Sequence, residues 1–182
     1  MSNHVGTLAA VAAIAAFLSW QPAEARAWGA RGVHGAAGGW ARQGCHGQSA
    51  GFGARRYGQG AMGAGGGHWT GANGGTLAAG GAGAWKRGVG GVWGTGASAT
   101  GAGGSTYKGY HAGKYNAQTG QGTWGSGKQV YDAKNGQTYG YTGDTSYQKG
   151  QGGVTQIDTN NKGDYTLDWG GGQKPVWTKD TQ

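Results

Sequence analysis

The feature that most limits what this chain can fold into is its shortage of aliphatic side chains. After residue 25, Leu, Ile, Val and Phe together account for only ten of 157 residues, whereas folded globular chains usually exceed about 20%. Glycine supplies 46 of all 182 residues, and it loses more conformational entropy on ordering than any other residue. A conventional core over the whole length is therefore excluded. After residue 25 the main apolar material is eight Trp and nine Tyr.

The first 25 residues differ from the rest of the chain. Val5 to Trp20 is uncharged and rich in Ala, and its 16 residues fall short of the roughly 20 that span a membrane. They suit the apolar region of a signal peptide, although no Lys or Arg precedes them. Small-x-small sites follow Pro22, so we expect a signal helix over residues 1–25, with cleavage after Ala25 or, alternatively, Ala27. This interpretation predicts a mature protein without a transmembrane span, located in the periplasm, on the cell surface or in the medium.

Residues 26–106 form a basic, glycine-rich stretch with 29 Gly, six Arg, one Lys and no acidic residue. Runs such as residues 79–84 show neither the 3.6-residue period of a helix nor a sustained two-residue period of a strand. Flexible coil is the default for such composition. We therefore predict a low-complexity Gly/Ala-rich arm that is mostly disordered or irregular.

Residues 107–182 have a different composition, with eight Lys, six Asp and eight of the nine Tyr. Tyr165–Trp169 and residues 137–142 alternate apolar with polar side chains, as half-buried strands do, and residues 154–159 are a third β-prone run. Asn135-Gly136 favours a type I′ turn, in which both residues have positive φ. We predict a small antiparallel all-β meander of five or six short strands.

A short motif recurs in this second part, at Tyr115–Gly120 (YNAQTG) and Tyr131–Gly136 (YDAKNG), 16 residues apart. In each copy a Tyr at the end of a strand is followed by an Asx-type turn, and a glycine ends that turn. Together with Ser126-Gly127 and the Trp-Gly steps, these motifs resemble those of glycine-rich cell-surface proteins of Gram-negative bacteria, some labelled mu-protocadherin-like. The resemblance implies a location outside the cytoplasm and supplies no catalytic residues.

Residues with catalytic or metal-binding chemistry are scattered. Copper, nickel and zinc accept imidazole ligands, which makes His34, His46 and His68 weak metal candidates, but their Gly-rich surroundings are not a repeated motif. Residues 101–105 lack the spacing of a phosphate-binding loop. After residue 25 no Glu remains, and the Asp residues are spread along the chain. We expect no cofactor and no enzymatic activity.

Basic and aromatic residues are the remaining candidates. The net charge of +8 attracts anionic polymers. Arg55-Arg56-Tyr57 is typical of segments that bind single-stranded nucleic acid, but export directs it toward extracellular polymers instead. Tyr139, Tyr141, Tyr165 and Trp169 are either a binding surface or the module's own thin core.

The sequence thus predicts a secreted or surface-associated structural or adhesive protein. Its partner would be an envelope or matrix polymer or another copy of itself, and not intracellular nucleic acid. The alternative is a binding module for extracellular polysaccharide or another anionic polymer.

Overall fold

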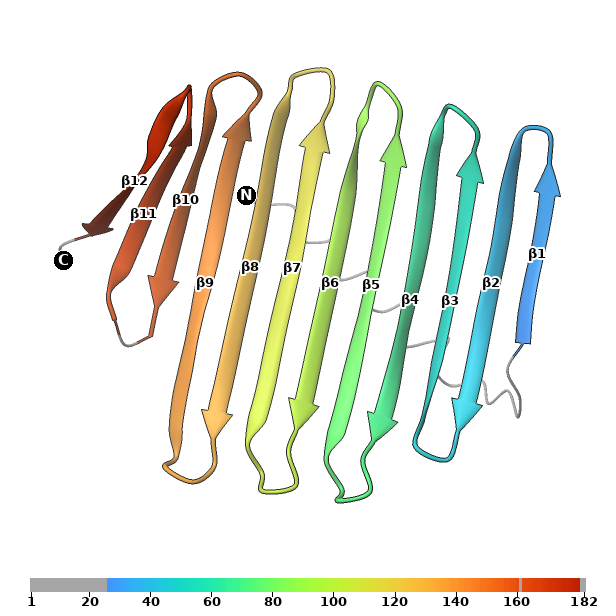
Figure 1. The fold of residues 1–182 in the computed structure, drawn as a ribbon, viewed down its shortest axis with the longest axis horizontal. Helices are drawn as coiled ribbons and strands as arrows, with labels where there is room; N and C mark the ends of the chain where they lie inside the picture. Colours follow the sequence, from blue (N-terminus) through green and yellow to red (C-terminus); the bar gives the residue numbers. More distant parts are fainter. Residues whose placement is uncertain (1–25, 161, 181–182) are drawn as a thin grey trace, which may run out of the picture.

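A single antiparallel sheet of twelve strands makes up the protein in the computed structural model, which describes residues 26–160 and 162–180 (Figure 1). The order of strands in the sheet is the order in the chain, so each strand pairs with its sequence neighbours. The strands are β1 (Arg26–Gly32), β2 (Gly35–Gly44), β3 (Gly47–Arg56), β4 (Gly60–Thr70), β5 (Thr76–Lys86), β6 (Gly90–Thr100), β7 (Thr106–Asn116), β8 (Gln121–Asp132), β9 (Gln137–Gln148), β10 (Gly152–Thr159), β11 (Asp164–Gly170) and β12 (Gln173–Asp180).

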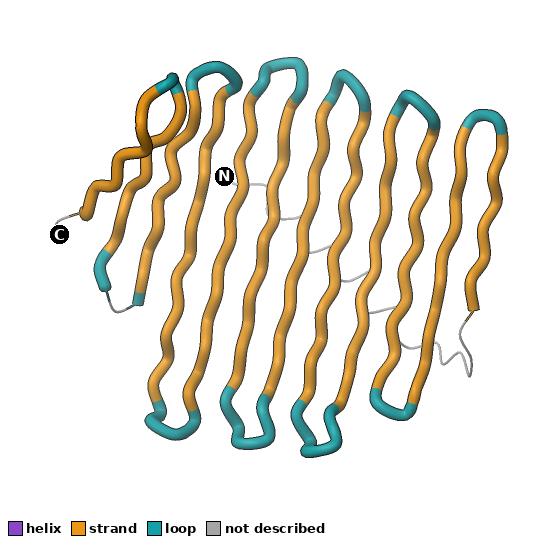
Figure 2. The backbone as a smooth tube through the Cα atoms, viewed as in Figure 1, coloured by secondary structure: helices purple, strands orange, loops and turns teal. Residues whose placement is uncertain are grey.

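All of the connections are short turns, and they lie along two opposite edges of the sheet (Figure 2). We call the edge that begins with the β1–β2 turn the upper turn edge, and the edge that begins with the β2–β3 turn the lower turn edge. Within the described residues no helix is long and apolar enough to cross a membrane. The expected signal helix lies outside the described residues.

The predicted C-terminal meander is confirmed. β7 to β12 are six antiparallel strands joined by hairpins. The two recurring motifs sit at successive turns, β7–β8 and β8–β9, so their 16-residue spacing is one strand plus one turn, and they lie at opposite turn edges. Both contain Asx turns, because Asn116 Oδ1 accepts a hydrogen bond from Gln118 N at 2.9 Å and Asp132 Oδ1 accepts one from Lys134 N at 3.0 Å.

The type I′ prediction for Asn135-Gly136 was wrong. Gly136 has a φ of 67°, but no non-glycine residue in the described chain has positive φ. The turn is instead a wider one, in which Gly136 N donates to Asp132 O at 2.9 Å. Asn135 uses its side chain, whose Oδ1 accepts a hydrogen bond from Gln137 N at 2.9 Å.

Residues 26–106 differ from the expected irregular arm, because they carry β1 to β6. The sheet also continues without a break past residue 106, since β6 and β7 pair from Gly90↔Asn116 to Thr100↔Thr106. Alternation is invisible in this part of the sequence because small residues fill both faces. Residues 79–84, for example, are the middle of β5.

These strands show a structural repeat instead of an alternation of apolar and polar side chains. β4, β5, β6 and β7 all have 11 residues. Thr70-Gly71-Ala72 at the β4–β5 turn recurs as Thr100-Gly101-Ala102 at the β6–β7 turn, 30 residues later. The unit is therefore two strands with two turns. Each unit pairs with the next through backbone hydrogen bonds, which need no particular side chain.

The described residues form one layer and enclose no hydrophobic core, because none of their hydrophobic side chains is buried. The last strands leave the plane of the others, and β12 crosses β11 in Figure 1. The register shifts between Asp168 and Gly170. Strand β11 comes so close to β10 there that a Cβ on Gly170 would lie 2.2 Å from the Gly152 Cα. Only glycine fits at both positions.

Candidate functional site

The two faces of the sheet carry different side chains. Register partners in an antiparallel pair share a face, and successive residues alternate between faces. Following the pairing from strand to strand places seven of the eight Trp in the described residues on one face, which we call the aromatic face: Trp40, Trp69, Trp85, Trp93, Trp124, Trp169 and Trp177. Six Tyr join them there: Tyr107, Tyr115, Tyr139, Tyr141, Tyr147 and Tyr165.

The opposite face is more polar. It holds Trp28, Phe52, Tyr110 and Tyr131. It also carries every Asp of the described residues except Asp132: Asp144, Asp158, Asp164, Asp168 and Asp180. On the aromatic face the charged residues are almost all basic. The sheet is therefore polarised between its two faces in both charge and aromatic content.

The four aromatic residues singled out from the sequence all lie on the aromatic face. Tyr139 and Tyr141 are each 42% exposed, whereas Tyr165 and Trp169 are half-buried. Tyr139 is held at the lower turn edge, where its hydroxyl donates to Gln137 Oε1 and accepts a hydrogen bond from Asn135 Nδ2 at 3.2 Å. The structure thus brings the four residues to one face but not to one site.

A tighter aromatic cluster forms around Trp169. The Tyr147 ring stacks on the Trp169 ring with centroids 5.7 Å apart, and the Trp124 ring lies 6.2 Å from Tyr147 and 6.3 Å from Trp169. Trp169 Nε1 donates to Thr155 Oγ1 at 3.3 Å, and that hydroxyl is 2.9 Å from the Thr145 hydroxyl. Thr145 is only 5% exposed. The three rings thus pack against one another, and Trp124 and Tyr147 were missed because their partners come from other strands.

Glycines accommodate the rings on this face. Trp93 and Trp124 are both register partners of Gly113, one from each side. A Cβ on Gly113 would lie 2.5 Å from Trp93 Cζ2 and 2.7 Å from the Trp124 Cβ. Gly153 lies in the same way between Tyr147 and Trp169. Large and small residues thus alternate across the strands, and each ring covers a neighbouring backbone.

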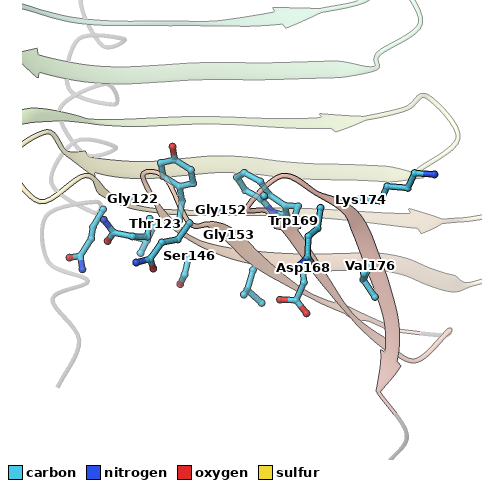
Figure 3. A pocket seen from close by; sticks show the side chains of 16 residues that line it. Gly122, Thr123, Ser146, Gly152, Gly153, Asp168, Trp169, Lys174 and Val176 are labelled. Atoms are coloured by element: carbon cyan, nitrogen blue, oxygen red, sulfur yellow. The ribbon is translucent and has the colours of Figure 1, made fainter.

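A shallow hollow of about 620 Å³ opens on the opposite face, where β11 and β12 leave the plane. Figure 3 shows Ser146, Asp168 and Val176 on one side of the sheet and Trp169 on the other. No histidine lines this hollow, so Ser146 has no imidazole base to activate it as a nucleophile. The hollow offers hydroxyl, amide and carboxylate groups for hydrogen bonding.

The three histidines named as metal candidates do not meet. His34 is at the upper turn edge, and His46 is at the lower turn edge, at the other end of β2. The ten residues of β2 span roughly 33 Å. His68 lies near the lower turn edge on the opposite face. In the described part of the chain, no group of three or more His, Cys, Asp or Glu side chains could hold a metal ion.

Comparison of the chain with family models, with curated proteins and with solved structures gives no match.

Proposed function

We propose that the protein is a secreted or surface-associated structural and adhesive component without catalytic activity, and that its aromatic face packs against the aromatic face of a second copy. The observation that carries this proposal is a one-layer sheet with most of its Trp on a single face and no buried hydrophobic side chain among the described residues. Stable domains bury the apolar face of a sheet against another layer. A second copy supplies that layer.

The area available is large enough for a stable dimer. Twelve strands at about 4.8 Å spacing, with an average of about ten residues at about 3.3 Å each, give a face of roughly 1,900 Å². Two such faces would bury up to about 3,800 Å² together, within the range of obligate homodimers. Overlap of more than about one third of each face would still exceed the roughly 1,200 Å² of the smallest stable interfaces.

The distribution of charge on the aromatic face also fits an interface. Arg31, Arg42 and Arg55 lie on the first three strands and Lys179 on the last one. Between them, on β4 to β11, Lys128 is the one Lys or Arg that a strand places on the aromatic face, and its Nζ lies 5.6 Å from the Tyr107 ring centroid. Protein interfaces commonly have an apolar centre and a charged rim.

The location outside the cytoplasm rests on residues 1–25, whose sequence is typical of an export signal. Fractionating cells into cytoplasm, periplasm, membranes and medium, with N-terminal sequencing of the recovered protein, tests it. We expect a mature chain that begins at Arg26 or Trp28 outside the cytoplasm. Recovery of intact Met1 in the cytosol would overturn this part of the proposal.

A second candidate function is the binding of an extracellular polysaccharide. One row across the aromatic face has large aromatic residues on β5, β7, β9 and β11, namely Trp85, Tyr115, Tyr147 and Trp169, and glycines on the strands between them. A straight row of rings along the sheet could follow an extended polymer. Sugar rings stack on aromatic faces, so this row favours a glycan over a globular partner.

One experiment separates the two functions. The triple variant W69S/Y141S/W177S removes exposed rings from the aromatic face, and W28S/F52S/Y110S removes rings of similar exposure, 41–63% against 39–61%, from the opposite face. Sedimentation analysis should show a wild-type dimer, a monomeric first variant and a dimeric second variant, all with strand-type circular dichroism. A monomeric wild type would overturn self-association. If in addition W85S/Y115S, which removes two rings of that row, loses binding to insoluble polysaccharide while W28S/F52S/Y110S keeps it, the second function holds.

A further inference from the structure

The turn between β3 and β4 forms one wall of a cleft at the upper turn edge. The cleft has a volume of about 440 Å³. Ala61 is the register partner of both Arg55 and Trp85, so a small residue lies between two large ones on the aromatic face. Tyr57 and Arg87, in the two turns, extend the walls. The cleft is the notch that Ala61 leaves in a row of bulky side chains.

The walls of this cleft are held in place by local contacts. The guanidinium carbon of Arg55 lies 5.1 Å from the centroid of the Tyr57 ring, in a cation–π arrangement. Arg87 N donates a hydrogen bond to Gln59 O at 2.6 Å, which joins the β5–β6 turn to the β3–β4 turn. The two turns, each with an arginine of the cleft close by, are therefore fixed relative to each other.

The charge around the cleft is of one sign. Arg55, Arg56 and Arg87 all line it, and residues 26–106 contain no Asp or Glu at all. Guanidinium groups bind carboxylate, sulfate and phosphate groups through paired hydrogen bonds, and such charge-assisted bonds are the stronger ones. An anionic group in this cleft would thus meet several donors and no nearby carboxylate of the same six strands.

The aromatic rings of the cleft are only partly available for stacking with the bases of nucleic acid. Single-stranded nucleic acid is bound by bases that stack on free aromatic faces. The Arg55 guanidinium already covers Tyr57. The Trp85 ring leans over the next strand, with Cδ1 3.2 Å from where a Cβ on Gly91 would be. One face of the Tyr57 ring is thus occupied, and although Trp85 is 52% exposed, the three guanidinium groups make the anionic group the principal determinant of recognition.

We propose that this cleft is a binding site for the carboxylate or sulfate groups of an acidic polysaccharide, with Arg55 and Arg87 as the principal ligands. The site lies at the turn edge of the sheet and does not depend on association through the centre of the aromatic face. It assigns to the upper turn edge a function separate from the structural one proposed above.

The test compares two double variants of the full chain that lose the same charge. R55Q/R87Q replaces the two arginines of the cleft that are proposed to bind the anionic group. R31Q/R42Q instead replaces two arginines of β1 and β2 that lie outside the cleft. Binding to polygalacturonate, dextran sulfate, neutral dextran and oligo(dT) is measured by calorimetry at physiological ionic strength. Because hydrogen bonds to charged groups contribute about tenfold each or more, R55Q/R87Q should lose at least tenfold in affinity for one or both acidic polysaccharides.

The control R31Q/R42Q should bind within about twofold of wild type, because the cleft is intact. R55K/R87K keeps the charge but loses the paired geometry, so an intermediate affinity is expected. Equal losses in both glutamine variants would show diffuse attraction and overturn the site. Tighter binding of oligo(dT) than of both acidic polysaccharides would overturn the ligand class. The comparison of polygalacturonate with dextran sulfate identifies the anionic group.

Discussion

Replacement of Gly113 by Ala tests whether glycine is present to make room for aromatic rings. Gly113 lies on β7 between Trp93 and Trp124. In a strand, glycine to alanine normally stabilises the folded state by about 0.5–1 kcal/mol, because alanine has less backbone entropy to lose. At this position the new Cβ would lie 2.7 Å from the Trp124 Cβ, an atom close to the backbone that cannot swing away.

The expected change in the free energy of unfolding is the balance of those two effects. Overpacking costs about 1–3 kcal/mol, so the net result is a destabilisation of about 1 kcal/mol. For a chain of this size that lowers the Tm by about 2–4 °C. The matched control is Gly96→Ala on β6, where the nearest atom, Gly109 O, is 3.6 Å from the new Cβ. The free energy of unfolding of that variant should be about 0.5–1 kcal/mol higher than that of wild type.

Urea unfolding followed by far-ultraviolet circular dichroism and by tryptophan fluorescence measures both variants. The two probes should give one midpoint, with the same dependence on urea as wild type, so that midpoints report stability. We expect the free energy of unfolding to fall in Gly113→Ala and to rise in Gly96→Ala. If Gly113→Ala is stabilised as much as Gly96→Ala, the rings do not depend on the missing side chain, and the packing argument for this face fails.

Two further outcomes follow from the sheet. Trp124→Ala should lower the free energy of unfolding by about 2–3 kcal/mol, since it removes a ring that lies 6.2 Å from Tyr147 and 6.3 Å from Trp169. Trp28→Ala, at a 63% exposed position, should change it by less than about 0.5 kcal/mol; equal urea midpoints would contradict the cluster. Deletion of residues 61–90 removes one complete 30-residue unit and keeps every later side chain on its face, so a folded ten-stranded sheet with a cooperative transition is expected. Deletion of residues 61–75 alone removes one strand and turns the aromatic face of β5 to β12 to the other side relative to β1–β3, so it should lower the urea midpoint further than the 30-residue deletion does.

The C-terminal strands could be predicted from the sequence because their side chains alternate clearly. One face of β11 carries apolar residues with a two-residue period, namely Tyr165, Leu167 and Trp169. The sequences of the Asx turns predict the hairpins on either side of β8. The same reasoning placed Tyr139, Tyr141, Tyr165 and Trp169 together in one β module, and the structure puts all four on one face.

The N-terminal strands could not be predicted because local alternation is only one way to specify a strand. In β5 both faces carry Gly and Ala, so the sequence shows no period. What specifies the strand is a pattern across strands, in which Trp85 on β5 is paired with Gly91 on β6. The aromatic cluster and the arginine cleft were missed for the same reason, since each joins residues that are far apart in the chain.

The identical order of strands in the chain and in the sheet has a consequence for how the protein forms. Each strand pairs only with its immediate predecessor and successor, so no strand has to wait for a distant strand to be synthesised before it can pair. Chains built from local contacts order rapidly, and repeating units can nucleate at one point and propagate. A polypeptide that emerges amino end first through a narrow opening can therefore add one hairpin after another to the edge already formed, and order itself as it arrives.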